Sequence, residues 1–144
     1  MTIDPGVLSG NNAERWRLEA LANRMDRTER DLGNGWTVSV ALAHLAFWDR
    51  LAALTLQRWE RGDIPSDEAE PDLLNDALIE EWRALSPRQA ADLAVAAARL
   101  VDAAVEALDA RTAAAVQARG KEWLLRRGVH RREHLDQIEG IVWG

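Results

Sequence analysis

Histidines are the residues of this sequence best suited to chemistry, and two of the three stand four positions apart. His130 and His134 have the spacing that places two side chains on one helix face, with Cβ atoms about 5–6 Å apart. Imidazole nitrogens so placed can converge on one metal ion. The same stripe continues to Ile138 and Ile141, which favours a face that points into the core. The alternative is a pair of surface histidines on an arginine-rich helix.

His44 is the third histidine, and it interrupts the most apolar stretch of the chain, Val40–Trp48. A buried imidazole there needs a partner, because an unpaired buried polar group costs about 1–3 kcal/mol. The partner can be a protein group, as for an ordinary core histidine, or a metal ion. Taken together, the three histidines predict a site for one divalent ion, with coordination positions left open for water or substrate.

The composition limits the chemistry that the chain can supply. It has 144 residues, no cysteine and a formal net charge of −6. Without cysteine there is no disulfide, no thiolate ligand and no cysteine nucleophile. The acidic balance repels a phosphate backbone, so we expect no nucleic-acid binding. A basic cluster near the C-terminus could bind one anion, but we interpret it as a solvated helix face. Its members are Arg126, Arg127, Arg131 and Arg132.

The sequence also bears on where the protein works. The segment before Gly10 has neither the basic start nor the apolar run of a secretory signal. The longest apolar run, Val40–Trp48, is much shorter than the roughly 20 residues that span a bilayer. We therefore expect a cytoplasmic protein with no membrane contact.

Helix-forming residues dominate and strand-like alternation is missing, so the predicted fold class is all-α. Capping residues and Gly or Pro breaks delimit the helices. The expected helices are Asn12–Leu32, Thr37–Arg61, Asp72–Leu85 after Pro71, a long one from Pro87 towards Arg119 with Ser86 as N-cap, and a last one within Glu122–Ile141 with a break allowed at Gly128. They predict a single domain over residues 1–144, a four-helix bundle with an additional short connecting helix.

Two stretches of the chain resemble known motifs. Trp36 is followed by a threonine, an apolar stretch and then His44, eight positions after the tryptophan, with Asp49 beyond it. His130 and His134 form a pair that is followed by an apolar residue and an isoleucine. Both stretches resemble the metal-site motifs of the DinB-like superfamily of metal-dependent enzymes. The similarity in helix order and length extends over most of the chain.

The resemblance implies a four-helix bundle with one ion, zinc or nickel, on His44, His130 and His134. It also implies a homodimer, a small-molecule substrate and activities such as transfer of a low-molecular-weight thiol, in a stress or detoxification role. Mycothiol-dependent maleylpyruvate isomerases resemble this bundle but carry a further C-terminal domain. Because this sequence ends at Gly144, we do not expect that activity.

A catalytic ion would generate a nucleophile from water or a thiol, for a hydrolase or transferase reaction. Asp49 and Glu133 are then candidates for proton transfer or for orienting the ligands. Residues 130–134 also match the H-x-x-E-H pattern of inverted zinc proteases, but Glu139 is the only later residue able to serve as a remote ligand. A further alternative is a non-catalytic protein of the same fold that binds a small molecule or carries a structural ion.

Overall fold

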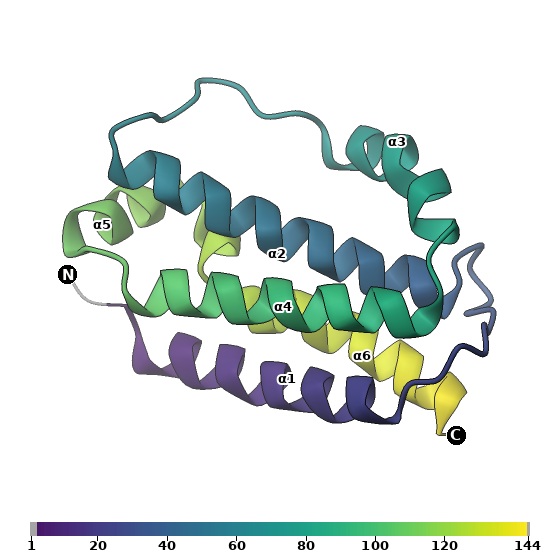
Figure 1. The fold of residues 1–144 in the computed structure, drawn as a ribbon. Coiled ribbons are helices and arrows are strands. Elements are labelled where there is room, and N and C mark those ends of the chain that lie inside the picture. Colours follow the sequence, from purple (N-terminus) through teal and green to yellow (C-terminus); the bar gives the residue numbers. More distant parts are fainter. Residues whose placement is uncertain (1–2, 144) are drawn as a thin grey trace.

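The computed structural model describes residues 3–143, and within that range every regular element is helical (Figure 1). In chain order the elements are α1 (Pro5–Arg24), α2 (Val38–Glu60), α3 (Pro71–Arg83), α4 (Pro87–Glu106), α5 (Ala110–Ala118), the short 3-10 helix η1 (Glu122–Leu124) and α6 (Arg127–Val142). The all-α fold class predicted from the sequence is confirmed.

The four longest helices pack around one common interior. α2 packs on α4, α4 on α1, α1 on α6, and α6 on α2. Figure 1 shows α1, α2 and α4 running side by side, with α6 behind them. The loop after α2 arches away from that helix before the chain enters α3, which packs on α2. α5 lies beside the C-terminal end of α2.

The interior consists of two apolar clusters separated by a polar layer. Side chains from the first half of α2 and from parts of α1, α4 and α6 form one cluster. Side chains from the second half of α2, from α5 and from η1 contribute to the other. Asp49 of α2 and Asp102 of α4 lie between the clusters and are buried, as is Arg131 of α6. These charged side chains therefore form a buried layer in the middle of the molecule instead of facing water.

α2 is the central helix, as its composition predicted. From Val40 to Leu45 every residue is buried. Among the described residues it is also the one helix with the length and apolar character of a membrane span, with a mean hydropathy of 1.2 over the best window. In this structure 67% of that window is buried inside the protein. The core helix of a helical domain has the same length and composition.

Helix starts with strong capping signals were predicted correctly. The Thr37 side chain accepts the backbone N–H of Val40 and begins α2. Ser86 and Gln89 form a reciprocal capping box at the start of α4. Pro71 occupies the first turn of α3, where the backbone N–H that it lacks would have no helical partner.

The predicted bounds of the first helix were wrong at both ends. α1 begins at Pro5, not near Asn12, because the Asp4 carboxylate caps its first turn. It ends at Arg24, whereas the prediction ran to Leu32. The residues in between form an irregular segment that still buries Leu32 against the core.

The long helix predicted from Pro87 towards Arg119 is two helices. α4 ends at Glu106, and the chain turns before α5 begins. The Asp109 carboxylate accepts the backbone N–H of Thr112 at 2.6 Å and so caps a new helix. The alanine-rich sequence on both sides hides this boundary.

The last helical segment, predicted within Glu122–Ile141, is also divided. A 3-10 turn precedes α6, and Gly128 lies in the first turn of α6 instead of breaking it. This glycine packs directly on the backbone of α1, where a Cβ on it would lie 2.6 Å from the carbonyl oxygen of Gly10. Asn11 accepts the Gly128 N–H at 2.8 Å and thereby joins α1 to the start of α6.

Candidate metal centre

All three histidines of the sequence meet at one place. His44 projects from α2, and His130 and His134 project from α6. One nitrogen of each ring lies within 4.8 Å of the other two, and the Nε2 atoms of His44 and His130 are 2.9 Å apart. The ring centroids are 4.8 to 4.9 Å from one another. The structure thus brings together the three residues that the sequence singled out.

The spacing of these nitrogens fits a divalent ion. Zinc–nitrogen bonds of about 2.0–2.1 Å in a tetrahedral site place two ligand atoms about 3.3–3.4 Å apart. The His44–His130 nitrogen pair, at 2.9 Å, is nearer than this, and all three nitrogens lie within 4.8 Å of one another, so the separations span the spacing that an ion requires.

The environment keeps the imidazoles neutral. Burial lowers the pKa of His44 to about 3, with smaller contributions from His134 and Arg127. Burial also lowers the pKa of His130 to about 2, and the Arg127 guanidinium adds to the effect. The pKa of His134 is lowered as well, again by burial. A metal ligand must be deprotonated, so these rings are in the charge state that ion binding requires near neutral pH.

Asn75 of α3 selects the tautomer of His44. Its Oδ1 lies 3.2 Å from Nδ1 of His44 and also accepts the indole N–H of Trp48 at 2.9 Å. An amide oxygen only accepts hydrogen bonds, so Nδ1 of His44 carries the proton. The lone pair is then on Nε2, which faces His130. This is the orientation that outer hydrogen bonds give to metal-binding histidines.

Arg127 has the opposite effect on His130. Its guanidinium lies 3.2 Å from Nδ1 of His130, and a guanidinium only donates. Nδ1 is therefore the acceptor, and Nε2–H of His130 donates to His44. Binding an ion through Nε2 of His130 requires this proton to leave and Arg127 to release Nδ1.

Two of the four arginines interpreted as a solvated face are in fact buried. Arg127 is 2% exposed and Arg131 is 0% exposed. Both donate to Asp49, at 2.8 and 2.9 Å, and Arg131 also binds both oxygens of Asp102. The interpretation was wrong for this pair because the carboxylates that compensate them come from other helices. Burial by itself lowers the pKa of Arg131, but Asp49 and Asp102 outweigh it and the pKa is raised.

The two carboxylates proposed from the sequence occupy different positions. Asp49 is fully buried, and each of its oxygens accepts from an arginine, so it reaches His130 only through Arg127. Glu133 is exposed and lines the same cavity as His44 and His130. Its charge partly offsets the effect of burial on the pKa of His134.

His44 and His130 line a cavity of about 420 Å³. Its walls come from α2, α3, η1 and α6, and include Trp48, Asn75, Trp123, Arg126 and Glu133. The partly buried Trp36 stacks on His134 with the ring planes 16° apart, and the buried Trp82 packs edge-on against His44. The cluster is therefore bordered by aromatic rings as well as by the cavity.

Sequence reasoning missed two groups that contact the histidines. Arg127 precedes His130 by three positions, so helix spacing alone places the two side chains on one face. That signal was present but was read as surface charge. Asn75 carries no comparable signal, because its contact with His44 depends on how α3 docks on α2.

Comparisons of the chain with protein-family models, with curated proteins and with solved structures found no match. The resemblance to the DinB-like superfamily therefore stays a prediction that rests on the two histidine motifs. The described residues define an all-helical protein in which three neutral histidines converge beside an open cavity.

Proposed function

We propose that this chain is a metal-dependent protein of the DinB-like superfamily, in which α1, α2, α4 and α6 form a four-helix bundle and α3 is the connecting helix. His44, His130 and His134 would hold one divalent ion, zinc or nickel. The observation that carries the proposal is the convergence of three imidazole nitrogens within 4.8 Å at the edge of a cavity. Their lowered pKa values and the Asn75 contact support it.

We further propose that the site is catalytic and acts on a small molecule, as a hydrolase or a thiol transferase. An ion with three protein ligands keeps a position for water or a thiol, whose pKa it lowers toward neutral. Glu133 lines the cavity and would accept the proton. Asp49 would act only indirectly, by holding Arg127, which orients His130 before the ion binds. With no cysteine in the chain, a thiol would come from a low-molecular-weight co-substrate.

Metal content tests the centre. We expect about one zinc or nickel ion per chain in the wild type, measured by mass spectrometry, and a large loss in each of the His44→Ala, His130→Ala and His134→Ala variants. Val129→Ala is the matched control, because it changes the same cavity without removing a histidine or a carboxylate. Wild-type occupancy in His44→Ala would refute the three-histidine site.

A structural ion is the second candidate, and the position of Glu133 favours it. Its carboxylate lines the cavity beside His44 and His130, and as a fourth ligand it would close the site. Cobalt substitution separates the two functions. An open site shifts its absorption spectrum when azide or a small thiol is added, whereas a site closed by Glu133 shows no shift until Glu133→Ala opens it.

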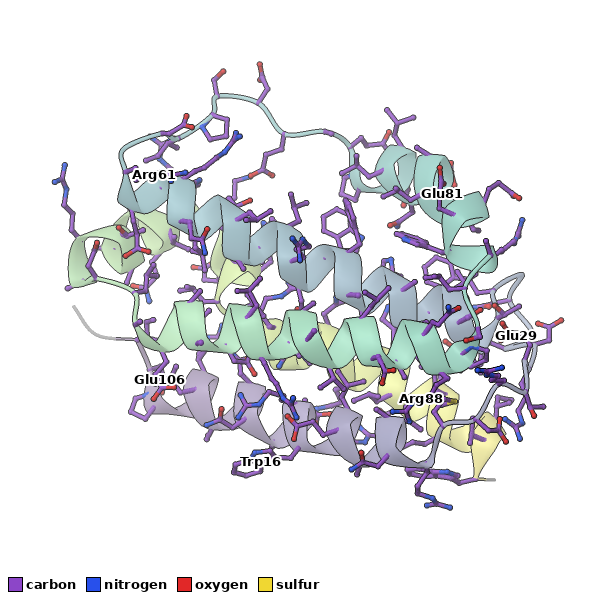
Figure 2. All side chains as sticks on the ribbon, viewed as in Figure 1. Trp16, Glu29, Arg61, Glu81, Arg88 and Glu106 are labelled. Carbon is purple, nitrogen blue, oxygen red and sulfur yellow. The ribbon has the colours of Figure 1, made fainter. Side chains whose placement is uncertain are left out.

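We also propose a cytoplasmic homodimer, which follows the family resemblance. Trp16 is 61% exposed and points away from the outer side of α1 (Figure 2). In such a dimer, the exposed tryptophan would supply a large apolar contact area. Light scattering at micromolar concentration should give twice the chain mass of 16.1 kDa. The Trp16→Glu variant should shift the protein toward the monomer.

A further inference from the structure

A second cavity adjoins the histidine cavity. It has a volume of about 460 Å³ and extends along α2 beneath the loop that leads to α3. Trp48, Pro71 and Trp123 line both cavities, so the two share a wall. Figure 1 shows this loop arching over the C-terminal half of α2. We call this second cavity the loop chamber.

Aromatic side chains gather around the loop chamber. Four of the chain's eight aromatic residues line it, namely Phe47, Trp48, Trp59 and Trp123. The ring planes of Phe47 and Trp48 are 88° apart, and those of Trp48 and Trp123 are 76° apart. Rings set nearly at right angles can surround a ligand from more than one side, and a ring face attracts positive charge. The chamber therefore has the aromatic walls that recognise cations.

Arginines already lie over two of these rings, but outside the chamber. The guanidinium of Arg127 is 5.5 Å from the ring centroid of Trp123, and that of Arg119 is 5.8 Å from the ring centroid of Trp59. Neither arginine lines the loop chamber. Within residues 3–143, no cation lies over the ring of Trp48, which is only partly buried. A cation inside the chamber would occupy that place.

The charged side chains around the chamber are mainly acidic. Asp67 and Glu68 of the loop are exposed and line it. Glu68 pairs with Lys121 at 3.3 Å, whereas Asp67 has no ion pair in the described part of the chain. Arg58 is the only cation among the described lining residues, and its side chain is 65% exposed and lies 3.9 Å from the carboxylate of Asp63. Since Asp63 does not line the chamber, it compensates Arg58 from outside and leaves Asp67 uncompensated.

We propose that the loop chamber is a binding site for an organic cation, such as a quaternary ammonium ion or a lipophilic amine. The apolar part of the ligand fills the chamber, and its charge lies against the ring of Trp48 on the side of Asp67. Both carboxylates repel an anion, and a neutral molecule gains nothing from them. This site goes beyond the metal centre and needs no ion.

The first test compares two ligands of the same shape that differ only in charge. Phenyltrimethylammonium and tert-butylbenzene have a nitrogen cation and a neutral carbon at the same position, and tryptophan fluorescence follows their binding. A purely apolar cavity prefers the neutral molecule, because a cation loses hydration on entering it. We expect the wild type to bind the cation about three- to tenfold more tightly. Equal or tighter binding of tert-butylbenzene would overturn the inference.

The second test removes the carboxylates. Asp67→Asn combined with Glu68→Gln should weaken phenyltrimethylammonium binding about three- to tenfold and leave tert-butylbenzene binding unchanged. Glu70→Gln is the matched control, since Glu70 is an exposed residue of the same loop that lines neither cavity, and it should bind both molecules as the wild type does. Wild-type affinity for the cation in the double variant would contradict the choice of a cation.

The third test removes aromatic faces. Trp48→Leu and Phe47→Leu keep an apolar wall but lose a ring, so each should reduce the preference for the cation over tert-butylbenzene. Trp16→Leu is the control, because Trp16 is 61% exposed and lines neither cavity, and it should keep the full preference. Circular dichroism checks that every variant folds. An undiminished preference in both chamber variants would place the cation elsewhere and overturn the inference.

These titrations also separate the loop chamber from the metal centre, because neither probe has a lone pair that could bind an ion. A protein that takes up no metal yet prefers the cation would refute the metal centre and support the chamber. A protein that takes up zinc but shows no preference for the cation would refute the chamber and leave the metal centre standing.

Discussion

At the scale of single residues, the histidine cluster is shaped by what surrounds each ring. Three imidazoles packed together repel one another when charged, and burial removes the water that would stabilise the charge. The rings therefore stay neutral without a carboxylate in contact with them. Asn75 then orients His44, and Arg127 orients His130, by hydrogen bonds that can form in only one direction.

The lowered pKa values predict acid sensitivity of the metal-free protein. The pKa of His44 is about 3 and that of His130 about 2 when folded, whereas an unfolded histidine titrates near 6.5. Below about pH 6.5 the unfolded chain binds more protons, so the free energy of unfolding is complete above that pH and falls below it. Urea denaturation from about pH 7.5 down to about pH 5 measures the slope. His130→Gln cannot ionise and should show a shallower slope, and equal slopes would contradict the shift.

Asp49 should matter for stability far more than an exposed carboxylate does. It compensates two buried guanidiniums, those of Arg127 and Arg131. Removing one partner of a buried ion pair costs about 3–5 kcal/mol, so Asp49→Asn should lower the free energy of unfolding by about that amount. The control is Asp136→Asn, whose carboxylate is 64% exposed and binds Arg17. That change should cost less than about 1 kcal/mol. Similar losses in both variants would argue against the buried network.

The sequence revealed the histidines but not their surroundings, for a physical reason. Spacing along one helix predicts which side chains share a face, and this sufficed for His130 and His134. Whether Arg131 is solvated or buried depends on carboxylates contributed by α2 and α4, which no local pattern contains. The contact of Asn75 with His44 likewise exists only after α3 has docked.

At the scale of helices, the boundaries predicted correctly were those marked by a capping residue in the local sequence. Thr37 and Ser86 cap helices through their own side chains, so a short window of sequence contains the whole signal. The boundary at Asp109 was missed because alanine-rich sequence on both sides is equally compatible with one continuous helix. The start of α1 was missed because Gly6, Gly10 and two asparagines that follow have low helix propensity.

The approach of α6 to α1 gives a prediction for Gly128. A Cβ at this position would lie 2.6 Å from the backbone oxygen of Gly10, and neither backbone can rotate away as a side chain could. Overpacking costs about 1–3 kcal/mol, which exceeds the gain of about 1 kcal/mol from replacing a helical glycine with alanine. We expect Gly128→Ala to destabilise the protein in urea denaturation. It should also weaken zinc binding, because His130 follows two residues later on the same helix.

Gly140 supplies the control within α6. A Cβ at Gly140 has no atom within 4 Å, so Gly140→Ala should stabilise the protein by up to about 1 kcal/mol. Opposite signs for the two glycines would establish the close approach at Gly128. Destabilisation of equal size at both positions would point to a general effect on α6 instead.

At the scale of the whole molecule, the polar layer divides the core and borders the metal centre. Arg131 and Asp102 connect α6 to α4, and Asp49 connects both arginines to α2. Asn11 and Arg15 add α1 to this network, through Arg131 and Asp102 respectively. All four packed helices are thus held in register by directional contacts, and apolar clusters on either side supply most of the burial. Because these contacts fix α2 and α6 relative to each other, they also fix the relative positions of the histidines. The cluster can therefore form before any ion binds.

A preformed cluster makes metal binding visible in the stability of the whole fold. A ligand that binds only the folded state adds RT ln(1 + [L]/Kd) to the free energy of unfolding, which is about 2.7 kcal/mol at a free zinc concentration of one hundred times Kd. For a chain of this size, that gain corresponds to a rise in Tm of roughly 5–10 °C. Because the apolar clusters hold the fold, the metal-free protein should still melt cooperatively, unlike a zinc finger.

Differential scanning calorimetry across a zinc titration checks this expectation. In the wild type, Tm should climb with the logarithm of the free zinc concentration once the site is saturated. The variant that combines His44→Ala with His134→Ala keeps the Asp49 network and should melt at one temperature throughout. A wild-type Tm that is insensitive to zinc and nickel alike would mean that the three histidines do not form a metal site. A rise of equal size in the double variant would place the ion elsewhere, because the remaining His130 has only one ring to offer it.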